Sequence, residues 1–397
     1  MADALLLQPD PKFIREVNAN SGGELKKCFQ CATCTSVCSL STEARPFPRK
    51  QVLEAQWGLK DRLLGDPAIW LCHDCADCTA RCPRGARPSA VMDALRMAVI
   101  RRVAFPGFIA SLIGEVETGI VVFVISALLL LSIAILPVSK FTVRPLVFAA
   151  MFPKDRLEPM FFAVAAWVVL ALTVGAVRFI RALRAAGTRG AILPALVPAL
   201  GEILRHRRFA SCGSGQSRRV GHLLTFYGFA GLAAMGTAVG IGSMFGLIDT
   251  PLPNLNPLKI FANVCALLLT AGVAVLILNR LGNRDKRTGS SFCDWYFLSL
   301  LGGIGFTGIL SEALRLTQSM DWMYFVYYVH LSLVLTLFLC APYSKFVHFL
   351  YRTIAMAATW QESRSPGRGQ LMADGPEVVS SEGPGLPHIV GTRSRYA

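Results

Sequence analysis

Eight cysteines near the start of the 397-residue chain form two blocks with the same spacing. Each block reads C-x2-C-x2-C-x3-C, in which three thiolates hold one [4Fe–4S] cluster and the fourth cysteine ligates a neighbouring cluster. The repeated pattern therefore predicts two clusters whose ligands cross between the blocks. One cluster would be held by Cys28, Cys31, Cys34 and Cys82, and the other by Cys72, Cys75, Cys78 and Cys38.

Zinc and disulfides are the two alternatives for these cysteines. Zinc sites usually pair two C-x2-C knuckles across a longer loop, and four cysteines within eleven residues crowd one tetrahedral ion. Disulfides require an oxidising compartment, whereas the topology argued below places this end of the chain in the cytoplasm. Two blocks of identical spacing thus favour iron–sulfur clusters.

The composition is that of a membrane protein. The chain is 53% hydrophobic and only 16% charged, with a mean hydropathy of +0.48, which is unusual for a soluble globule. The net charge of +15 does not indicate nucleic-acid binding, because the basic residues gather in short loops between apolar runs.

Helical periodicity dominates the sequence. No strand pattern precedes residue 105, and apolar residues recur at helical spacing after Pro88, so the cysteine-rich head is predicted to be helical. Farther along, residues 191–204 are apolar but hold two prolines and are too short to span a bilayer, which predicts a segment lying on its surface. Six apolar runs come near the roughly 20 residues that a spanning helix needs: 117–136, 160–180, 223–247, 258–278, 295–314 and 323–341.

Arginine and lysine are dense before the first run, between the second and third, between the fourth and fifth, and after the sixth. By the positive-inside rule both termini are cytoplasmic, in a multi-pass protein of the cytoplasmic (inner) membrane. Lys140, Arg144, Lys154 and Arg156, in the loop at 137–159, run against this rule. The fifth run, 295–314, is the least regular because it is rich in glycine and contains Glu312.

Three histidines lie in or at the ends of the apolar runs: His222, His330 and His348. An ionisable side chain in a membrane helix is by default a functional hypothesis. His330 and His348 both belong to the sixth helix, and their spacing in the sequence places them five turns and about 27 Å apart on one face. His222 opens the third run at the cytoplasmic side, at the same depth as His348, so this pair is predicted to ligate one haem b from two helices. Interfacial histidines remain the alternative for the pair, and His206 in the basic loop is either solvated or near haem propionates or a quinone headgroup.

Two resemblances agree with these inferences. Residues 24–102, with Cys-Phe-Gln-Cys-Ala-Thr-Cys and Ile-Trp-Leu-Cys-His-Asp-Cys, resemble the C subunit of heterodisulfide reductase. The membrane half, with His-Arg-Arg-Phe after Arg205 and Pro-Tyr-Ser-Lys-Phe-Val-His at 342–348, resembles the gamma subunit of respiratory nitrate reductase, a cytochrome b family. That family pairs two histidines on its final helix with two on an earlier helix, but Leu232 stands where the second early histidine is expected. The resemblance thus implies one haem at His222 and His348. His330 either binds a second haem with another partner ligand, which the five-turn histidine pair favours, or lies beside a quinone.

The combination resembles the C subunit of quinone-modifying (quinone-interacting) membrane-bound oxidoreductase complexes. We therefore expect an all-α chain: a helical two-cluster ferredoxin domain at 1–104, a six-helix transmembrane cytochrome b domain at 105–352, and a disordered cytoplasmic tail at 353–397. The resemblance implies electron transfer between the quinone pool and soluble partners in sulfur metabolism. Those partners would be two flavin and iron–sulfur subunits resembling the A subunit of heterodisulfide reductase, and adenylylsulfate reductase. No nucleophile–base pair or phosphate loop is recognisable, so the redox cofactors would carry the chemistry.

Two other functions fit the same motifs. One is a cytochrome b and ferredoxin fusion that serves another dehydrogenase, as in the tricarballylate utilisation membrane protein. The other is a membrane-tethered iron–sulfur sensor without turnover, which would contain no haem.

Overall fold

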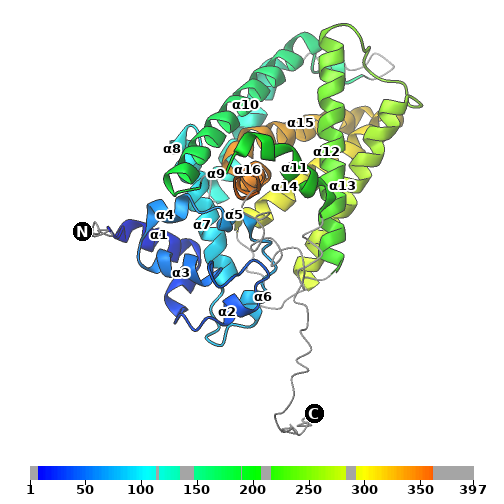
Figure 1. Cartoon of the computed structure of the whole chain (residues 1–397). Coiled ribbons are helices and arrows are strands. Elements are labelled where there is room, and N and C mark those ends of the chain that lie inside the picture. Colours follow the sequence, from blue (N-terminus) through cyan, green and yellow to red (C-terminus); the bar gives the residue numbers. More distant parts are fainter. Residues whose placement is uncertain are drawn as a thin grey trace, which may run out of the picture.

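The structure is a computed structural model that describes residues 8–112, 116–134, 147–188, 190–206, 216–282 and 292–360 (Figure 1). Several features of the sequence lie outside these ranges. They are Lys140 and Arg144, the basic residues at 207–208 and 284–287, and the predicted tail from residue 361 onward.

The prediction of an all-α chain is confirmed: the described residues form helices and no strands. The cysteine-rich head consists of short helices around one longer helix, α7, as its helical periodicity predicted. Asp10 caps the first of these helices, because its side chain accepts hydrogen bonds from the backbone N–H groups of Lys12 and Phe13 at 2.9 and 3.0 Å. The elements are α1 (Pro11–Asn20), η1 (Glu24–Lys27), α2 (Thr33–Ser36), α3 (Arg49–Gln56), α4 (Lys60–Leu64), α5 (Ala68–Leu71), α6 (Asp77–Ala80) and α7 (Pro88–Val103).

Longer apolar helices follow the head. Five of them are long and apolar enough to cross a membrane, which supports the membrane assignment, while the apolar stretch Glu117–Ile133 of α9 is shorter. The structure therefore supports five of the six predicted membrane-spanning helices. The elements are α8 (Gly107–Leu112), α9 (Val116–Ile133), η3 (Phe148–Ala150), α10 (Lys154–Ala185), α11 (Ile192–Arg205), α12 (Gln216–Met244), α13 (Pro257–Gly282), α14 (Phe292–Leu316) and α15 (Met320–Cys340).

The irregular features of α14 have local explanations. Glu312 accepts hydrogen bonds from Lys259 at 3.0 Å and from Arg315 at 2.9 Å, so its charge is balanced within the protein. A Cβ atom added at Gly308 would lie only 3.0 Å from Cε1 of the His330 imidazole. Glycine here lets α14 approach α15 closely.

One prediction about the final helix is wrong. The helix α15 ends at Cys340, two short 3-10 turns follow at Ala341–Tyr343 and Lys345–Val347, and α16 (His348–Thr359) begins at His348. Pro342 has no backbone N–H to continue the helical hydrogen bonds, and Ser344 is extended with ψ of −178°. His330 and His348 therefore lie on different helices, and the expected five-turn separation does not apply. Because α16 continues past residue 352 with Ile354 and Ala355 buried, the boundary expected there is corrected.

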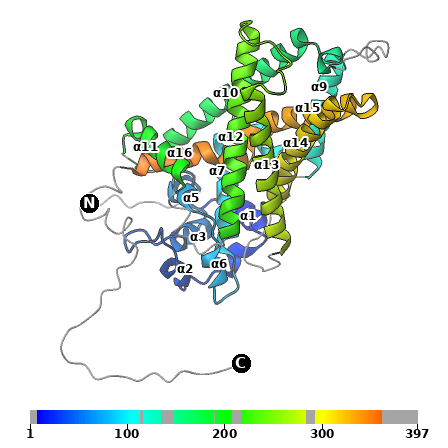
Figure 2. The ribbon, with the colours of Figure 1, turned by 90° about the vertical axis from the view of Figure 1, so that its right-hand side faces the viewer.

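The head and the membrane helices share one hydrophobic core. Trp70 of α5 packs against Tyr351 of α16 and Phe179 of α10, with ring centroids 5.1 and 6.1 Å apart. Arg178 of α10 donates a hydrogen bond to the carbonyl of Ala104 at 2.7 Å, which fastens the chain where the head ends. The two parts are thus joined through packed side chains and not only through the chain. In both views α5 of the head lies beside α16 (Figures 1 and 2).

The segment predicted to lie on the membrane surface is the amphipathic helix α11. Ala195 and Ala199 are buried, and α11 packs against α16. Leu193 and Val197 face outward with 81% and 79% of their surface exposed. An outward apolar face on a helix too short to span is suited to the boundary between lipid and water.

Candidate functional site

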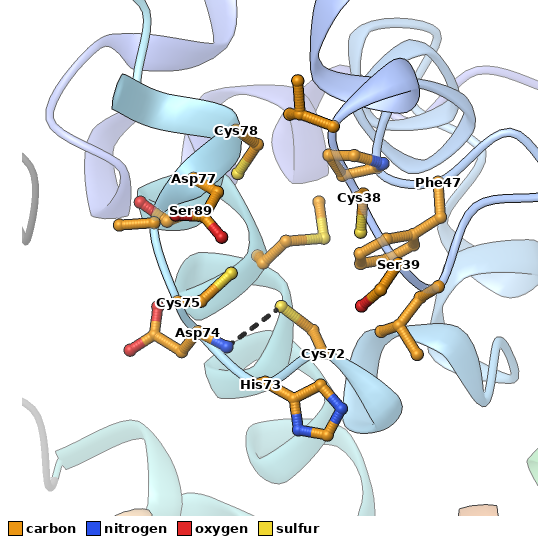
Figure 3. A pocket seen from close by; sticks show the side chains of 15 residues that line it. Cys38, Ser39, Phe47, Cys72, His73, Asp74, Cys75, Asp77, Cys78 and Ser89 are labelled. Carbon is orange, nitrogen blue, oxygen red and sulfur yellow. Dashed lines mark hydrogen bonds between the residues drawn. The ribbon is translucent and has the colours of Figure 1, made fainter. Parts of the chain in front are cut away.

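Four cysteines from two separate segments line one cavity in the head. Cys38 comes from the first block, and Cys72, Cys75 and Cys78 come from the second. Figure 3 shows their sulfur atoms arranged around the space between the two segments. This is the combination that the crossed ligand scheme predicts for the second cluster.

The two blocks share an unusual backbone conformation. Gln30 and Ala32 have φ values of 60° and 69°, and the equivalent Asp74 and Ala76 have 53° and 62°. Residues other than glycine rarely adopt this left-handed region, and such strain marks functional loops. In the second block the backbone N–H of Asp74 consequently points at the sulfur of Cys72, 3.4 Å away. Donors aimed at sulfur are one means by which proteins adjust the potential of a cluster.

The electrostatics of the cysteines suit a metal cluster. Burial, together with the neighbouring Cys72 and Cys75, raises the pKa of the Cys38 thiol to about 11. Burial also raises the pKa of Cys34, whose thiol neighbours are Cys28 and Cys31 of its own block. Such thiols ionise only where positive charge compensates them, which the iron of a cluster would supply. Cys82 lies just after α6, and α6 packs beside α2 of the first block.

A buried carboxylate fastens the two blocks together. Glu24, just before the first block, is 4% exposed and accepts hydrogen bonds from the backbone N–H and the Nε of Arg87, at 3.0 and 3.1 Å. Lys27 donates a third bond at 2.9 Å. Because Arg87 follows the second block closely, this contact fixes the start of one block against the end of the other.

Three histidines gather where α11, α12 and α16 meet. His206, at the end of α11, lies edge to face with His222 of α12 at a centroid distance of 5.5 Å. His206 and His348 are both electrostatic neighbours of His222. The structure thus brings together the pair His222 and His348 that the sequence singled out, and it adds His206 to them.

The residues at this histidine cluster fit a haem. The Nδ1 of His348 lies 2.6 Å from the carbonyl oxygen of Lys345, which orients the ring and leaves Nε2 for a ligand. The side chains of His348 and Phe349 are exposed, and Phe226 of α12 faces Phe349 with a centroid distance of 6.2 Å. Within the described residues the Nε of Arg219, three positions before His222, is buried without a hydrogen-bond partner. His222 and His348 would hold the iron, and the Nε of Arg219 would be available to a propionate.

Arginines connect this histidine cluster to the second cysteine block, and sequence reasoning missed these contacts. Arg352 of α16 donates hydrogen bonds to the carbonyl of Cys72 at 3.1 Å and to Nδ1 of His73 at 3.0 Å. Arg218 of α12 donates to the carbonyl of Asp74 at 2.8 Å. In the sequence both arginines served only to assign the membrane topology, because no local pattern relates residues 72–74 to residues 218 and 352.

His330 stands apart from the other histidines. Its Nδ1 is 3.1 Å from Oγ1 of Thr307 on α14, and that hydroxyl donates to the carbonyl of Gly303 at 2.6 Å, so the imidazole is the donor to the threonine. Leu232, at the position where a ligand histidine was expected, packs in an apolar group with Leu333 and Val334. The structure therefore brings no second histidine to His330 within the described ranges.

Comparison with known proteins finds a family model that matches the cysteine-rich head and a distant relative that matches nearly the whole chain. A family model described as a 4Fe-4S dicluster domain matches residues 24–86. The C subunit of the H(2):CoB-CoM heterodisulfide,ferredoxin reductase of Methanothermobacter thermautotrophicus is 37% identical over 102 residues, which are 25% of this chain and 52% of that protein. A protein of Archaeoglobus profundus, described as similar to the C subunit of heterodisulfide reductase, is 39% identical over 87 residues, 21% of this chain and 46% of that protein. The chain thus spans about half the length of these relatives.

Citrate utilization protein B of Escherichia coli is 24% identical over 395 residues, which cover 92% of this chain and 98% of that protein. No solved structure matches the chain. The N-terminal part of the chain is therefore a 4Fe-4S dicluster domain that resembles the C subunit of heterodisulfide reductase, carried on membrane helices.

Proposed function

We propose that the chain is a membrane electron-transfer subunit that passes electrons between the quinone pool and soluble flavin and iron–sulfur partners. His222 and His348 hold a haem b, and the two cysteine blocks hold [4Fe–4S] clusters with crossed ligands. These groups supply one-electron transfer when bound, and the protein positions them. Both termini face the cytoplasm.

The observation that carries this proposal is a repeated pairing of arginine and histidine. Arg218 and His222 are one helical turn apart on α12, and His348 and Arg352 are one turn apart on α16. Both arginines bind the backbone of the loop that contains Cys72 and Asp74. The proposed haem ligands therefore lie one helical turn from arginines that contact the proposed cluster loop. This arrangement gives electrons a short route between the haem and the second cluster.

The partners follow from resemblance. We propose two flavin and iron–sulfur subunits resembling the A subunit of heterodisulfide reductase, with adenylylsulfate reductase as the soluble redox partner in sulfur metabolism. A second candidate is a fusion of cytochrome b and ferredoxin that serves another dehydrogenase, and the full-length similarity to citrate utilization protein B favours it. Affinity purification of the tagged chain from its native membranes separates the two: the first yields two flavin and iron–sulfur subunits, and the second a single flavoprotein dehydrogenase.

A reduced-minus-oxidised spectrum of the purified protein tests the proposal. We expect haem b bands, and we expect a quinol to reduce both the haem and the clusters. Iron–sulfur signals without any haem would overturn the relay and support the membrane-tethered sensor. Haem that dithionite reduces but quinols do not would exclude the quinone pool as the source of electrons.

A further inference from the structure

The two cysteine blocks differ in what surrounds them. Arg96 of α7, Arg218 and Arg352 all bind backbone carbonyls of the loop that begins the second block. That loop is therefore covered by helices of the chain itself. In the first block Cys31 is exposed, and the ring of its neighbour Phe29 is 66% exposed.

Basic residues surround this exposed part of the first block. Lys26 and Lys27 precede Cys28, while Arg81 and Arg84 flank Cys82, and all four side chains are exposed. The guanidinium of Arg84 lies 4.1 Å from the centroid of the Phe29 ring, so the two segments meet in a cation–π contact. We name Lys26, Lys27, Phe29, Arg81 and Arg84 the basic face.

The acidic residues near this surface leave it positive. Glu24 is buried and already bonded to Lys27 and Arg87, and Asp77 of α6 is half-buried. An exposed aromatic ring beside arginine is the composition found at the energetic centres of protein interfaces. Both views place α2 and α6 at the lower end of the molecule, below the long apolar helices (Figures 1 and 2). This position favours a soluble partner over a lipid surface.

We propose that the basic face is the docking surface for an acidic, soluble redox protein, which exchanges electrons with the cluster of the first block. The inference rests on the proposed electron-transfer function and adds an order to it: the second block faces the membrane helices and the first block faces the partner. One electron leaves the head and one electron enters the acceptor of the partner. No bond forms or breaks and no proton is required.

Native and succinylated cytochrome c test this surface, because they carry the same haem on a basic and on an acidic protein. The full chain is placed in nanodiscs of phosphatidylcholine and reduced with a limiting amount of dithionite, and its oxidation by each cytochrome is followed by stopped flow. Dithionite reduces the clusters directly, so the assay needs neither quinone nor the haem site. Failure of the quinone relay would therefore leave this test intact.

The double variant Lys26→Glu/Arg84→Glu is compared with Lys12→Glu/Arg15→Glu, which changes the net charge equally at two exposed residues of α1 outside the basic face. Electrostatic steering changes association rates by about 10–1000-fold. We expect succinylated cytochrome c to react at least about tenfold faster than the native form at low salt, and we expect this advantage to fade at about 0.5 M salt, where charges are screened. Lys26→Glu/Arg84→Glu should lose the advantage with an unchanged iron content, and Lys12→Glu/Arg15→Glu should keep it.

Three results would overturn the inference. The first is equal rates with the two cytochromes in the wild-type protein, which requires no variant to fold. The second is an equal loss of rate in Lys12→Glu/Arg15→Glu and in Lys26→Glu/Arg84→Glu, which would indicate an effect of total charge alone. The third is that nanodiscs containing phosphatidylglycerol block the reaction with succinylated cytochrome c in the wild-type protein but not in Lys26→Glu/Arg84→Glu. That result would make the basic face a lipid-binding surface.

Discussion

Replacing Glu24 by glutamine should loosen the contact between the two cysteine blocks. Two bonds from Arg87 reach the carboxylate, and hydrogen bonds to a charged group contribute about 1.5–3 kcal/mol each. The bond from Lys27 is discounted, because that side chain is 51% exposed. Glutamine keeps one acceptor and loses the charge, so we expect a loss of about 2–4 kcal/mol of stability in the head.

The assay is the half-life of the iron–sulfur absorbance in urea with an iron chelator, without oxygen. Cluster release is coupled to unfolding of the head, because the ligands come from both blocks. We expect the half-life of Glu24→Gln to fall at least about tenfold. Glu16→Gln is the matched control: its partner Arg101 is 2.9 Å away, but both side chains are partly exposed, so the pair contributes at most about 1 kcal/mol. Equal half-lives for the two variants would refute the role given to Glu24.

The same residue predicts a pH dependence. Burial would raise the pKa of Glu24, but the hydrogen bonds from Lys27 and Arg87 outweigh it and lower the pKa below its ordinary value. A lowered pKa contributes stability above the unfolded-state value of about 4.3, and this stability disappears as the pH falls through the folded-state value. The difference in half-life between wild type and Glu24→Gln should therefore shrink below about pH 4. A difference in half-life that grows as the pH falls would mean that folding raises, and does not lower, the pKa of Glu24.

Four substitutions test the cofactor sites. Cys38→Ser should remove or alter the EPR signal of the cluster that Cys72, Cys75 and Cys78 hold, because it lines the same cavity; a loss confined to the first-block signal would exclude the crossed scheme. His222→Ala or His348→Ala should remove the low-spin haem b while the iron content of the clusters stays at about eight, and haem contents equal to wild type would refute the pairing. His330→Leu should leave about one haem per chain, as in wild type, and impair quinol oxidation; a fall from two haems to one would instead make His330 a ligand.

The cysteine arrangement was predictable because the spacing of cysteines within each block indicates which of them share a cluster. Three cysteines with two residues between neighbours hold one cluster, and the fourth cysteine of this pattern ligates the other cluster. The structure accordingly places Cys38 in a cavity with cysteines that lie more than thirty positions away. The left-handed backbone at Gln30, Ala32, Asp74 and Ala76 carried no such signal, because none of these residues is glycine.

The membrane half was less predictable because its features depend on distant contacts. Apolar periodicity continues through residues 323–341, and the pattern gave no reason to separate His330 from His348 beyond the sequence Ala-Pro-Tyr-Ser. That sequence is a break signal: Pro342 lacks a donor, and Ser344 accepts a hydrogen bond from the backbone N–H of Phe346 at 3.3 Å. The contact between Arg218 and Asp74 joins residues far apart in the sequence, and no sequence periodicity indicates such a contact.

The break between α15 and α16 determines how the head meets the membrane. A continuous helix would carry residues 348–359 onward along the axis of α15. The break instead lets α16 pack its buried face, with Tyr351 and Ala355, against α5, α10 and α11. In that position Arg352 reaches the carbonyl of Cys72, while His348 lies one turn earlier beside His222. The same short helix therefore contacts both proposed cofactor sites, and the wrong prediction of a single long helix concealed the element that links them.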